Sequence, residues 1–145
     1  MAIKTVFFDI GDTLVRDKKW IPGAKQLVIS LKAKKIAVGV ISNTGNLDRE
    51  KLAKLLPDDF DFEIFREDLV FLSSEAGMDK RNLGLFTMAI QHAGNSPWEV
   101  MFVGESLDES LKAQQSGMRA ARIANLPEDF GKLAAAIIRK PDANR

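Results

Sequence analysis

A doubly wound α/β fold, with a five-stranded parallel sheet as the middle of three layers, is predicted by two features of the sequence. Short runs rich in Val, Ile and Phe alternate with segments whose apolar residues recur at helical spacing, as in a parallel sheet covered on both faces. The 145 residues are also enough for one domain with one core. We therefore predict a single Rossmann-like domain over 1–145, in which 140–145 form a polar tail.

Strands and helices are expected in alternation along the chain. The strands are the apolar runs "TVFFDI", "IAVGVI", "LVFL", "VMFV" and "AARI", at 5–10, 36–41, 69–72, 100–103 and 120–123. Helices are expected between and after them, at 22–35, 47–56, 82–93, 107–116 and 128–139. Pro22 suits a first helical turn and Pro57 stops the second helix, whereas Gly94 and Gly117 suit the left-handed conformation that ends a helix.

Charge and composition exclude several kinds of function. The chain has 21 Lys and Arg against 20 Asp and Glu, so no overall field attracts nucleic acid or an anionic membrane. It has no cysteine and one histidine, so a bound metal would be a hard cation held by carboxylates. Apolar runs are too short to span a membrane and no leader is recognisable before the first strand, so we expect a cytoplasmic protein.

Polar residues follow the predicted strands, and the carboxyl edge of such a sheet is where ligands bind. Asp9 and Glu105 follow two of the strands and could together hold one Mg²⁺ ion, which prefers oxygen ligands. The Ser42 hydroxyl could hold phosphoryl oxygens, and Lys80 could supply positive charge in phosphoryl transfer. Further polar residues at these strand ends are Asp12, Asn43, Ser73, Ser74 and Ser106.

Four motifs stand in order along the chain. They are "VFFDIGDTLV" from Val6, "IAVGVISNTG" from Ile36, "SSEAGMDKRNLGLF" from Ser73 and "VMFVGESLDESLKAQQSGM" from Val100. Together they resemble the haloacid dehalogenase-like (HAD) hydrolases over roughly residues 4–125. The alternative is an unrelated doubly wound domain such as a response-regulator receiver, which would not need "VGES" after the fourth strand.

The resemblance implies phosphatase chemistry dependent on Mg²⁺. Asp9 would be the nucleophile that attacks a phosphoryl group and forms an aspartyl-phosphate. Mg²⁺ would be bound by Asp9, by the backbone carbonyl of Gly11, by Glu105 and by a second acid of the fourth motif. That second acid falls on Glu109, with Asp108 as a competing candidate.

The same resemblance implies which residues bind the substrate. Ser42 and Lys80 would hold the phosphoryl oxygens, Asn43 beside Ser42 would contact the substrate, and Thr13 would brace the nucleophile loop. The segments before and after Ser42 are each filled by one helix and one strand, which leaves no room for a cap domain. Capless members act on large substrates or close the site by oligomerising, so a homo-oligomer is one expectation.

The chain departs from the family pattern at two places. Gly11 replaces the aspartate that protonates the leaving group, a contribution of about 10²–10⁴-fold. Asp12 is a candidate replacement acid, and its alternative role is to shape the turn. In the fourth motif, Glu105 follows the glycine at the position where the family has aspartate, and the second acid is Glu109. A glutamate is one methylene longer than an aspartate, and octahedral Mg²⁺ tolerates displaced ligands poorly.

The predicted function is therefore a HAD-like phosphomonoester phosphatase of low activity. Its substrate would be a phosphorylated small molecule or a macromolecular phosphoester, and not nucleic acid. Without the acid at position 11, it should prefer leaving groups that need little protonation, such as aryl, acyl or anomeric phosphates. The alternative is a catalytically degenerate HAD-fold protein that serves as a binding or regulatory module.

Overall fold

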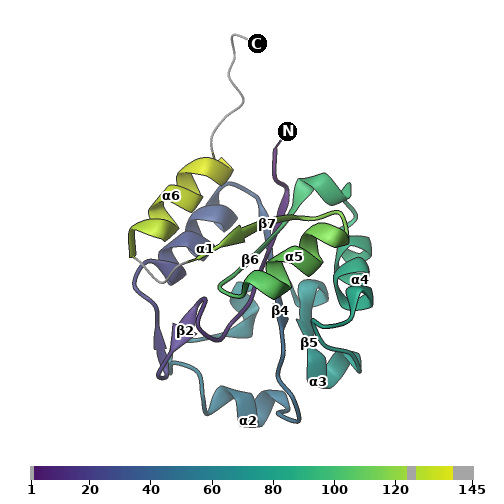
Figure 1. Ribbon diagram of the computed structural model, residues 1–145. Coiled ribbons are helices and arrows are strands. Elements are labelled where there is room, and N and C mark those ends of the chain that lie inside the picture. The colour runs from purple at the N-terminus through teal and green to yellow at the C-terminus, as the bar shows by residue number, and fades with distance from the viewer. Residues whose placement is uncertain (1, 124–126, 139–145) are drawn as a thin grey trace.

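A five-stranded parallel sheet forms the centre of the molecule (Figure 1). The computed structural model describes residues 2–123 and 127–138. The strand order is β5-β4-β1-β6-β7, and every pairing in it is parallel. The strands are β1 (Thr5–Phe8), β4 (Ala37–Ser42), β5 (Val70–Leu72), β6 (Val100–Gly104) and β7 (Arg119–Arg122). The predicted sheet is confirmed, whereas the predicted tail at 140–145 lies outside the described residues.

Helices cover both faces of the sheet, as predicted. Helices α1 (Ala24–Ala33) and α6 (Pro127–Ile138) lie on one face, and α4 (Leu83–Ala93) and α5 (Leu107–Gln115) lie on the other (Figure 1). The central strand β1 alternates accordingly, because Val6 and Phe8 pack in one hydrophobic cluster and Phe7 packs in the other. These layers fix the positions of the loops that follow β1, β4 and β6.

One glycine allows β4 to pack closely against Leu69, which directly precedes β5, and against Phe7 of β1. A Cβ atom at Gly39 would lie 2.4 Å from the carbonyl oxygen of Leu69 and 2.8 Å from Phe7 Cδ1. Both separations are shorter than any real contact of a Cβ atom, and one of them involves backbone that cannot move freely. Gly39 is therefore required by packing in the middle of β4.

Short elements lie around the carboxyl ends of the strands and at the loops. Helices α2 (Arg49–Ala53) and α3 (Ser73–Ala76) are at the bottom of Figure 1, below the carboxyl ends of β4 and β5. The 3-10 turns are η1 (Phe62–Ile64), η2 (Glu67–Leu69) and η3 (Pro97–Glu99). Among residues 2–123 and 127–138, no helix has the length and apolar character needed to cross a membrane.

Three local features differ from the prediction. A small antiparallel hairpin, β2 (Val15–Arg16) with β3 (Lys19–Trp20), follows the first loop and was not predicted. Its turn residues Asp17 and Lys18 have positive φ angles of 51° and 61°, without the Asn or Gly that usually indicates such a turn. Helix α1 begins only at Ala24, and α2 is shorter than the predicted 47–56.

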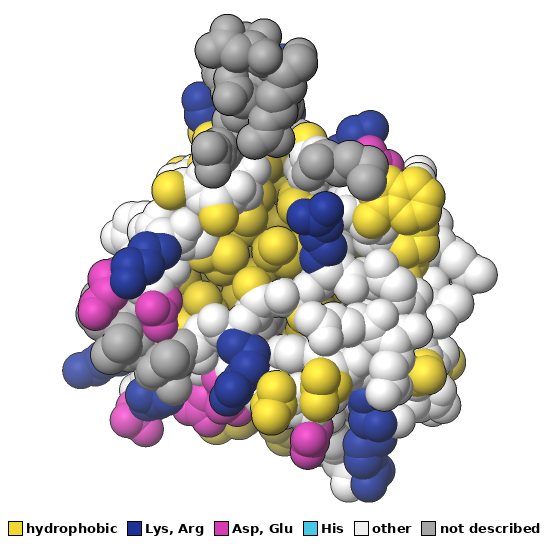
Figure 2. All heavy atoms as spheres, turned by 45° about the horizontal axis from the view of Figure 1, so that its top comes forward, with side chains coloured by type: hydrophobic (Ala, Val, Ile, Leu, Met, Phe, Trp, Pro, Cys, Tyr) yellow, Lys and Arg dark blue, Asp and Glu magenta, His cyan; other side chains and the backbone are white. Residues whose placement is uncertain are grey.

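The face shown in Figure 2 carries a gathered patch of hydrophobic side chains with Lys and Arg side chains around it. This view brings the top of Figure 1 forward, whereas α2 and α3 lie at the bottom of Figure 1. The hydrophobic patch is therefore separate from the carboxyl edge, where the predicted site residues are located.

Candidate active site

The nucleophile candidate Asp9 follows β1 at the carboxyl edge of the sheet. Its side chain is largely buried, and its backbone N–H donates to the carbonyl oxygen of Val103 in the neighbouring strand at 3.0 Å. One carboxylate oxygen, Oδ1, accepts the N–H of Ile10 at 2.9 Å and lies 2.9 Å from Lys80 Nζ. The other oxygen, Oδ2, receives no hydrogen bond from any residue that the structure describes. The carboxylate is thus held by one oxygen while the other is available.

Lys80 lies between two carboxylates. It is 1% exposed, and its Nζ is 2.9 Å from Asp9 Oδ1 and 2.5 Å from Glu109 Oε1. The ammonium also lies 5.5 Å from the centroid of the Phe102 ring. A buried ammonium group needs compensating charge, and these two carboxylates supply it. The three groups together carry one net negative charge, which favours the approach of a cation.

The loop after β4 contributes Ser42 and Asn43. Ser42 is buried, and its hydroxyl makes no hydrogen bond within the described part of the chain, so it is free to bind a ligand. The Oδ1 atom of Asn43 accepts the backbone N–H of Lys80 at 2.9 Å, which ties the β4 loop to the segment before α4. The structure therefore brings Asp9, Ser42, Asn43 and Lys80 together as predicted.

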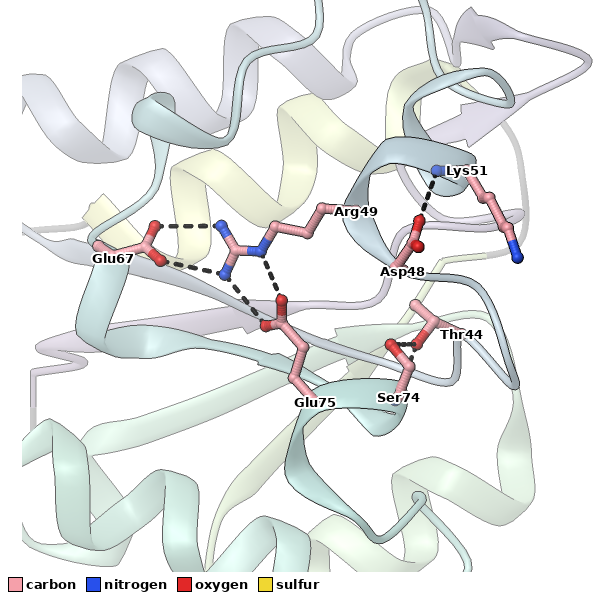
Figure 3. A network of polar contacts seen from close by, with 7 residues as sticks. All are labelled: Thr44, Asp48, Arg49, Lys51, Glu67, Ser74 and Glu75. Carbon is pink, nitrogen blue, oxygen red and sulfur yellow. Dashed lines mark hydrogen bonds and ion pairs between the residues drawn. The ribbon is translucent and has the colours of Figure 1, made fainter.

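Thr44 fastens the same loop to helix α3 (Figure 3). Its backbone N–H donates to Ser73 Oγ at 2.7 Å, and its hydroxyl donates to Ser74 Oγ at 2.8 Å. The backbone N–H of Ser74 in turn donates to Thr44 Oγ1 at 3.0 Å. The two serines that follow the third strand, Ser73 and Ser74, therefore support the loop that carries Ser42.

Arg49, at the start of α2, joins that helix to two other segments. Its guanidinium donates to Glu75 Oε2 at 2.9 Å and lies 3.1 Å from Glu67 Oε1, so that it bridges α3 and η2 (Figure 3). Hydrogen bonding to Glu75 is the main cause that raises the pKa of Arg49 above its ordinary value, and Glu67 adds to it. Because the partners of Arg49 and Thr44 are 18 to 30 positions away, no local sequence pattern indicated either residue.

Asp12 lies in the turn of the nucleophile loop and lines the second of the two cavities described below. It has a left-handed conformation with φ of 58°, it is exposed, and its Oδ1 accepts Arg16 Nε at 3.0 Å. Its backbone N–H donates to the carbonyl oxygen of Val15 at 2.8 Å. These contacts are typical of a residue that shapes a turn, and the expected role of Asp12 as the replacement acid stays a prediction.

Gly11 and Thr13 complete the nucleophile loop. A Cβ atom added to Gly11 would meet no other heavy atom within 4 Å, so the position of the missing acid is open space. Thr13 is fully buried, and its backbone N–H donates to the carbonyl oxygen of Ile10 at 3.3 Å. Its hydroxyl finds no hydrogen-bond partner among the described residues, so packing and the backbone, rather than the hydroxyl, brace the loop.

The described carboxylates near Asp9 do not form a metal site of three acidic side chains. Within 2–123 and 127–138, no group of three or more His, Cys, Asp and Glu side chains could hold a metal ion. The carboxylate of Glu109, the expected second acid of the fourth motif, lies against Lys80 in an ion pair. Mg²⁺ needs only one or two carboxylates, with waters and substrate oxygens completing its octahedron.

The remaining donors do fit Mg²⁺. A Cβ atom at Gly104 would lie 3.7 Å from Asp9 Cβ, which places the following residue, the half-buried Glu105, beside the nucleophile loop. Asp9, the carbonyl of Gly11 and Glu105 supply only oxygen, as this ion prefers. Asp108 is exposed in the first turn of α5, where a carboxylate interacts favourably with the helix dipole.

Two cavities open at the site, and Asn43 contributes to both. The first, which we call the charged cavity, has a volume of about 430 Å³. The second, which we call the leucine cavity, has a volume of about 330 Å³. The charged cavity is lined by Asn43, Lys80, Arg81, Ser106, Asp108, Glu109, Leu111, Lys112 and Gln115. The leucine cavity is lined by Ile10, Gly11, Asp12, Val15, Arg16, Asp17, Ser42, Asn43, Thr44, Leu47, Leu52, Leu55 and Leu56.

Residues 6–82 match the family model described as haloacid dehalogenase-like hydrolase, which covers more than half of the chain. The chain belongs to this family. The resemblance noted in the sequence is thereby confirmed, and so is the capless architecture, because the described HAD core has only the small hairpin and α1 between β1 and β4.

One curated relative is the glyceraldehyde 3-phosphate phosphatase of Methanothermobacter thermautotrophicus, which is 34% identical over 101 residues. The match covers 68% of this chain and 42% of the relative, so the chain spans about two fifths of that protein's length.

Solved structures confirm the HAD fold. A HAD-superfamily hydrolase from Ehrlichia chaffeensis has a TM-score of 0.71 at 15% identity, with 95% of this chain and 98% of that chain covered. A HAD family enzyme from Bacteroides thetaiotaomicron, in complex with magnesium and inorganic phosphate, has a TM-score of 0.64 at 18% identity, covering 83% of this chain and 94% of its own. At these identities the likeness concerns the fold alone.

Proposed function

We propose that the protein is a Mg²⁺-dependent phosphatase that cleaves a phosphomonoester through an aspartyl-phosphate on Asp9. The observation that carries this proposal is the geometry of the Asp9 carboxylate. Oδ1 is oriented by the Ile10 N–H and Lys80 Nζ, both at 2.9 Å, whereas Oδ2 receives no hydrogen bond from the described residues. A nucleophile fixed in one orientation avoids much of the entropic cost of reaching the attacking geometry.

The first step transfers the phosphoryl group to Asp9. The carboxylate attacks phosphorus, a new P–O bond forms to Asp9, and the bond to the leaving-group oxygen breaks. Ser42 would bind a phosphoryl oxygen through its free hydroxyl, and Lys80 would place positive charge against the charge that develops. Mg²⁺, held by Asp9, the Gly11 carbonyl and Glu105, would supply further charge neutralisation at the phosphoryl oxygens.

The second step restores Asp9. Water attacks the aspartyl-phosphate, so that inorganic phosphate leaves and the carboxylate is regenerated. Gly11 has no side chain, and the carboxylate of Asp12 is paired with Arg16 at 3.0 Å, so neither position supplies the free acid that the family uses to protonate the leaving group. The leaving group therefore departs as an anion, and aryl, acyl and anomeric phosphates are the substrates that permit this.

A second candidate function is a HAD-fold binding or regulatory module without turnover. The commitment of Asp12 to Arg16 and of Glu109 to Lys80 favours it, because both acids are removed from proton transfer or metal binding. The orientation of Asp9 and the free Ser42 hydroxyl favour the phosphatase. The related phosphatase acts, by its name, on glyceraldehyde 3-phosphate, which supports a phosphorylated small molecule as the substrate class here.

The test is phosphate release from phenyl phosphate, acetyl phosphate and an anomeric sugar phosphate, with Mg²⁺ and with a chelator. We expect release that requires Mg²⁺ and that is lost in Asp9→Asn, a variant of nearly equal size. If no substrate is hydrolysed but the phosphoryl mimic beryllofluoride binds to the wild type, the binding module is favoured. If beryllofluoride does not bind either, the phosphatase proposal is overturned.

A further inference from the structure

We propose that the leaving group of the substrate is aromatic and occupies the leucine cavity. This inference rests on the proposed phosphatase function and adds the chemical class of the group that is released. The cavity begins at the phosphoryl position, because Gly11 and Ser42 both line it. A phosphoester bound at Asp9 and Ser42 would therefore direct its leaving group either into this cavity or into the charged cavity.

The walls of the leucine cavity are suited to an apolar ring. Four leucines from α2 and its flanking turns line it, and one of them, Leu55, has 56% of its surface exposed. Leu47 is half-buried beside it, whereas Leu52 and Leu56 are buried beneath. When an apolar ligand covers an exposed leucine in the wall of a concave site, apolar surface is removed from water, and this stabilises the complex.

Gly11 makes space for the ring. The cavity borders Gly11, and a Cβ atom there would meet no heavy atom within 4 Å. The same substitution that removes the acid therefore leaves an open approach from the phosphoryl position to the leucines. An aryl leaving group suits both properties, because a phenolate departs without a proton donor and its ring fits an apolar wall.

The leucine cavity is also lined by charged side chains. Asp12 and Arg16 neutralise one another in an ion pair at 3.0 Å, and Asp17 adds a negative charge at the hairpin turn. The charged cavity, with Lys80, Arg81 and Lys112, is suited to hydrated polar groups instead.

Binding of non-hydrolysable phosphonates tests the inference without turnover. Benzylphosphonate carries the ring and methylphosphonate does not, and calorimetry in the presence of Mg²⁺ gives a dissociation constant for each. We expect benzylphosphonate to bind about tenfold more tightly, the effect of removing roughly 50–60 Å² of apolar surface from water. Leu55→Asn should remove most of this difference and leave methylphosphonate binding unchanged.

Leu111→Asn is the matched control, since Leu111 is 45% exposed and lines the charged cavity. Its phosphonate affinities should equal those of the wild type. Equal binding of the two phosphonates, or a loss of the difference in Leu111→Asn alone, would overturn the inference and leave the phosphatase proposal standing. Failure of both phosphonates to bind, together with no phosphate release from any substrate, would overturn the proposed function as well.

Turnover provides a second readout. For the wild type we expect kcat/KM for phenyl phosphate to exceed its value in Leu55→Asn by about tenfold. Acetyl phosphate, whose leaving group has no ring, should give the same kcat/KM in both proteins. An equal loss on both substrates would mean that Leu55 acts through the stability of the loop, which contradicts a contact with the leaving group.

Discussion

Restoring the missing acid as Gly11→Asp should raise activity on substrates with poor leaving groups. The position accepts a side chain, because a Cβ atom meets no heavy atom within 4 Å and Gly11 is not among the residues with positive φ. General acid–base catalysis contributes about 10²–10⁴-fold. We expect a gain in kcat/KM at the low end of this range, about 10²-fold, because a Cβ atom at position 11 has no neighbour within 4 Å that would hold the new side chain in place. A gain of about 10²-fold corresponds to about 2.7 kcal/mol of activation free energy.

The assay compares two leaving groups in two variants. An alkyl phosphate requires protonation of its leaving group, whereas p-nitrophenyl phosphate does not, so kcat/KM should rise strongly for the first and little for the second. Gly11→Asn is the control, since it has nearly the same shape and no acid. An equal gain in both variants would refute the reasoning. No gain in either would also refute it, and would place the defect at Glu105.

Three further variants test the packing and the charges around the site. Lys80→Met leaves Asp9 and Glu109 without their cation, so we expect urea unfolding at pH 7 to show a loss of about 3 kcal/mol in the free energy of unfolding; wild-type stability would contradict this. Gly39→Ala should lower the free energy of unfolding by about 2–3 kcal/mol through overlap with neighbouring backbone, and wild-type stability would contradict the packing described. Thr13→Val should change it by less than about 1 kcal/mol, because the hydroxyl has no partner in the described structure; a larger loss would indicate a hydrogen bond to this hydroxyl.

The sheet could be predicted from the sequence because its strands are buried on both faces. Such strands are continuous apolar runs, and the five runs correspond to the observed strands within about two residues at either end. The hairpin could not be predicted, because Asp17 and Lys18 are unusual residues for positive φ angles. The end of α2 was also misplaced: residues after Ala53 form turns, and these turns carry Leu55 and Leu56 to the leucine cavity.

The grouping of Asp9, Ser42, Asn43 and Lys80 could be predicted because the carboxyl ends of parallel strands meet at one edge. The pairing within that group could not. Whether Glu109 faces a metal ion or Lys80 depends on side-chain conformations and on the burial of Lys80, which no spacing in the sequence specifies. The leucine cavity likewise combines residues from two loops with no shared sequence pattern.

The central claim is that Asp9 itself receives the phosphoryl group. The most direct measurement is mass spectrometry of peptides from protein quenched in acid during turnover of phenyl phosphate with Mg²⁺. We predict a phosphoryl group on the peptide that contains Asp9, in Gly11→Asp less than in the wild type, and none in Asp9→Asn. A phosphoryl group on another residue, or turnover that persists in Asp9→Asn, would contradict the proposed mechanism.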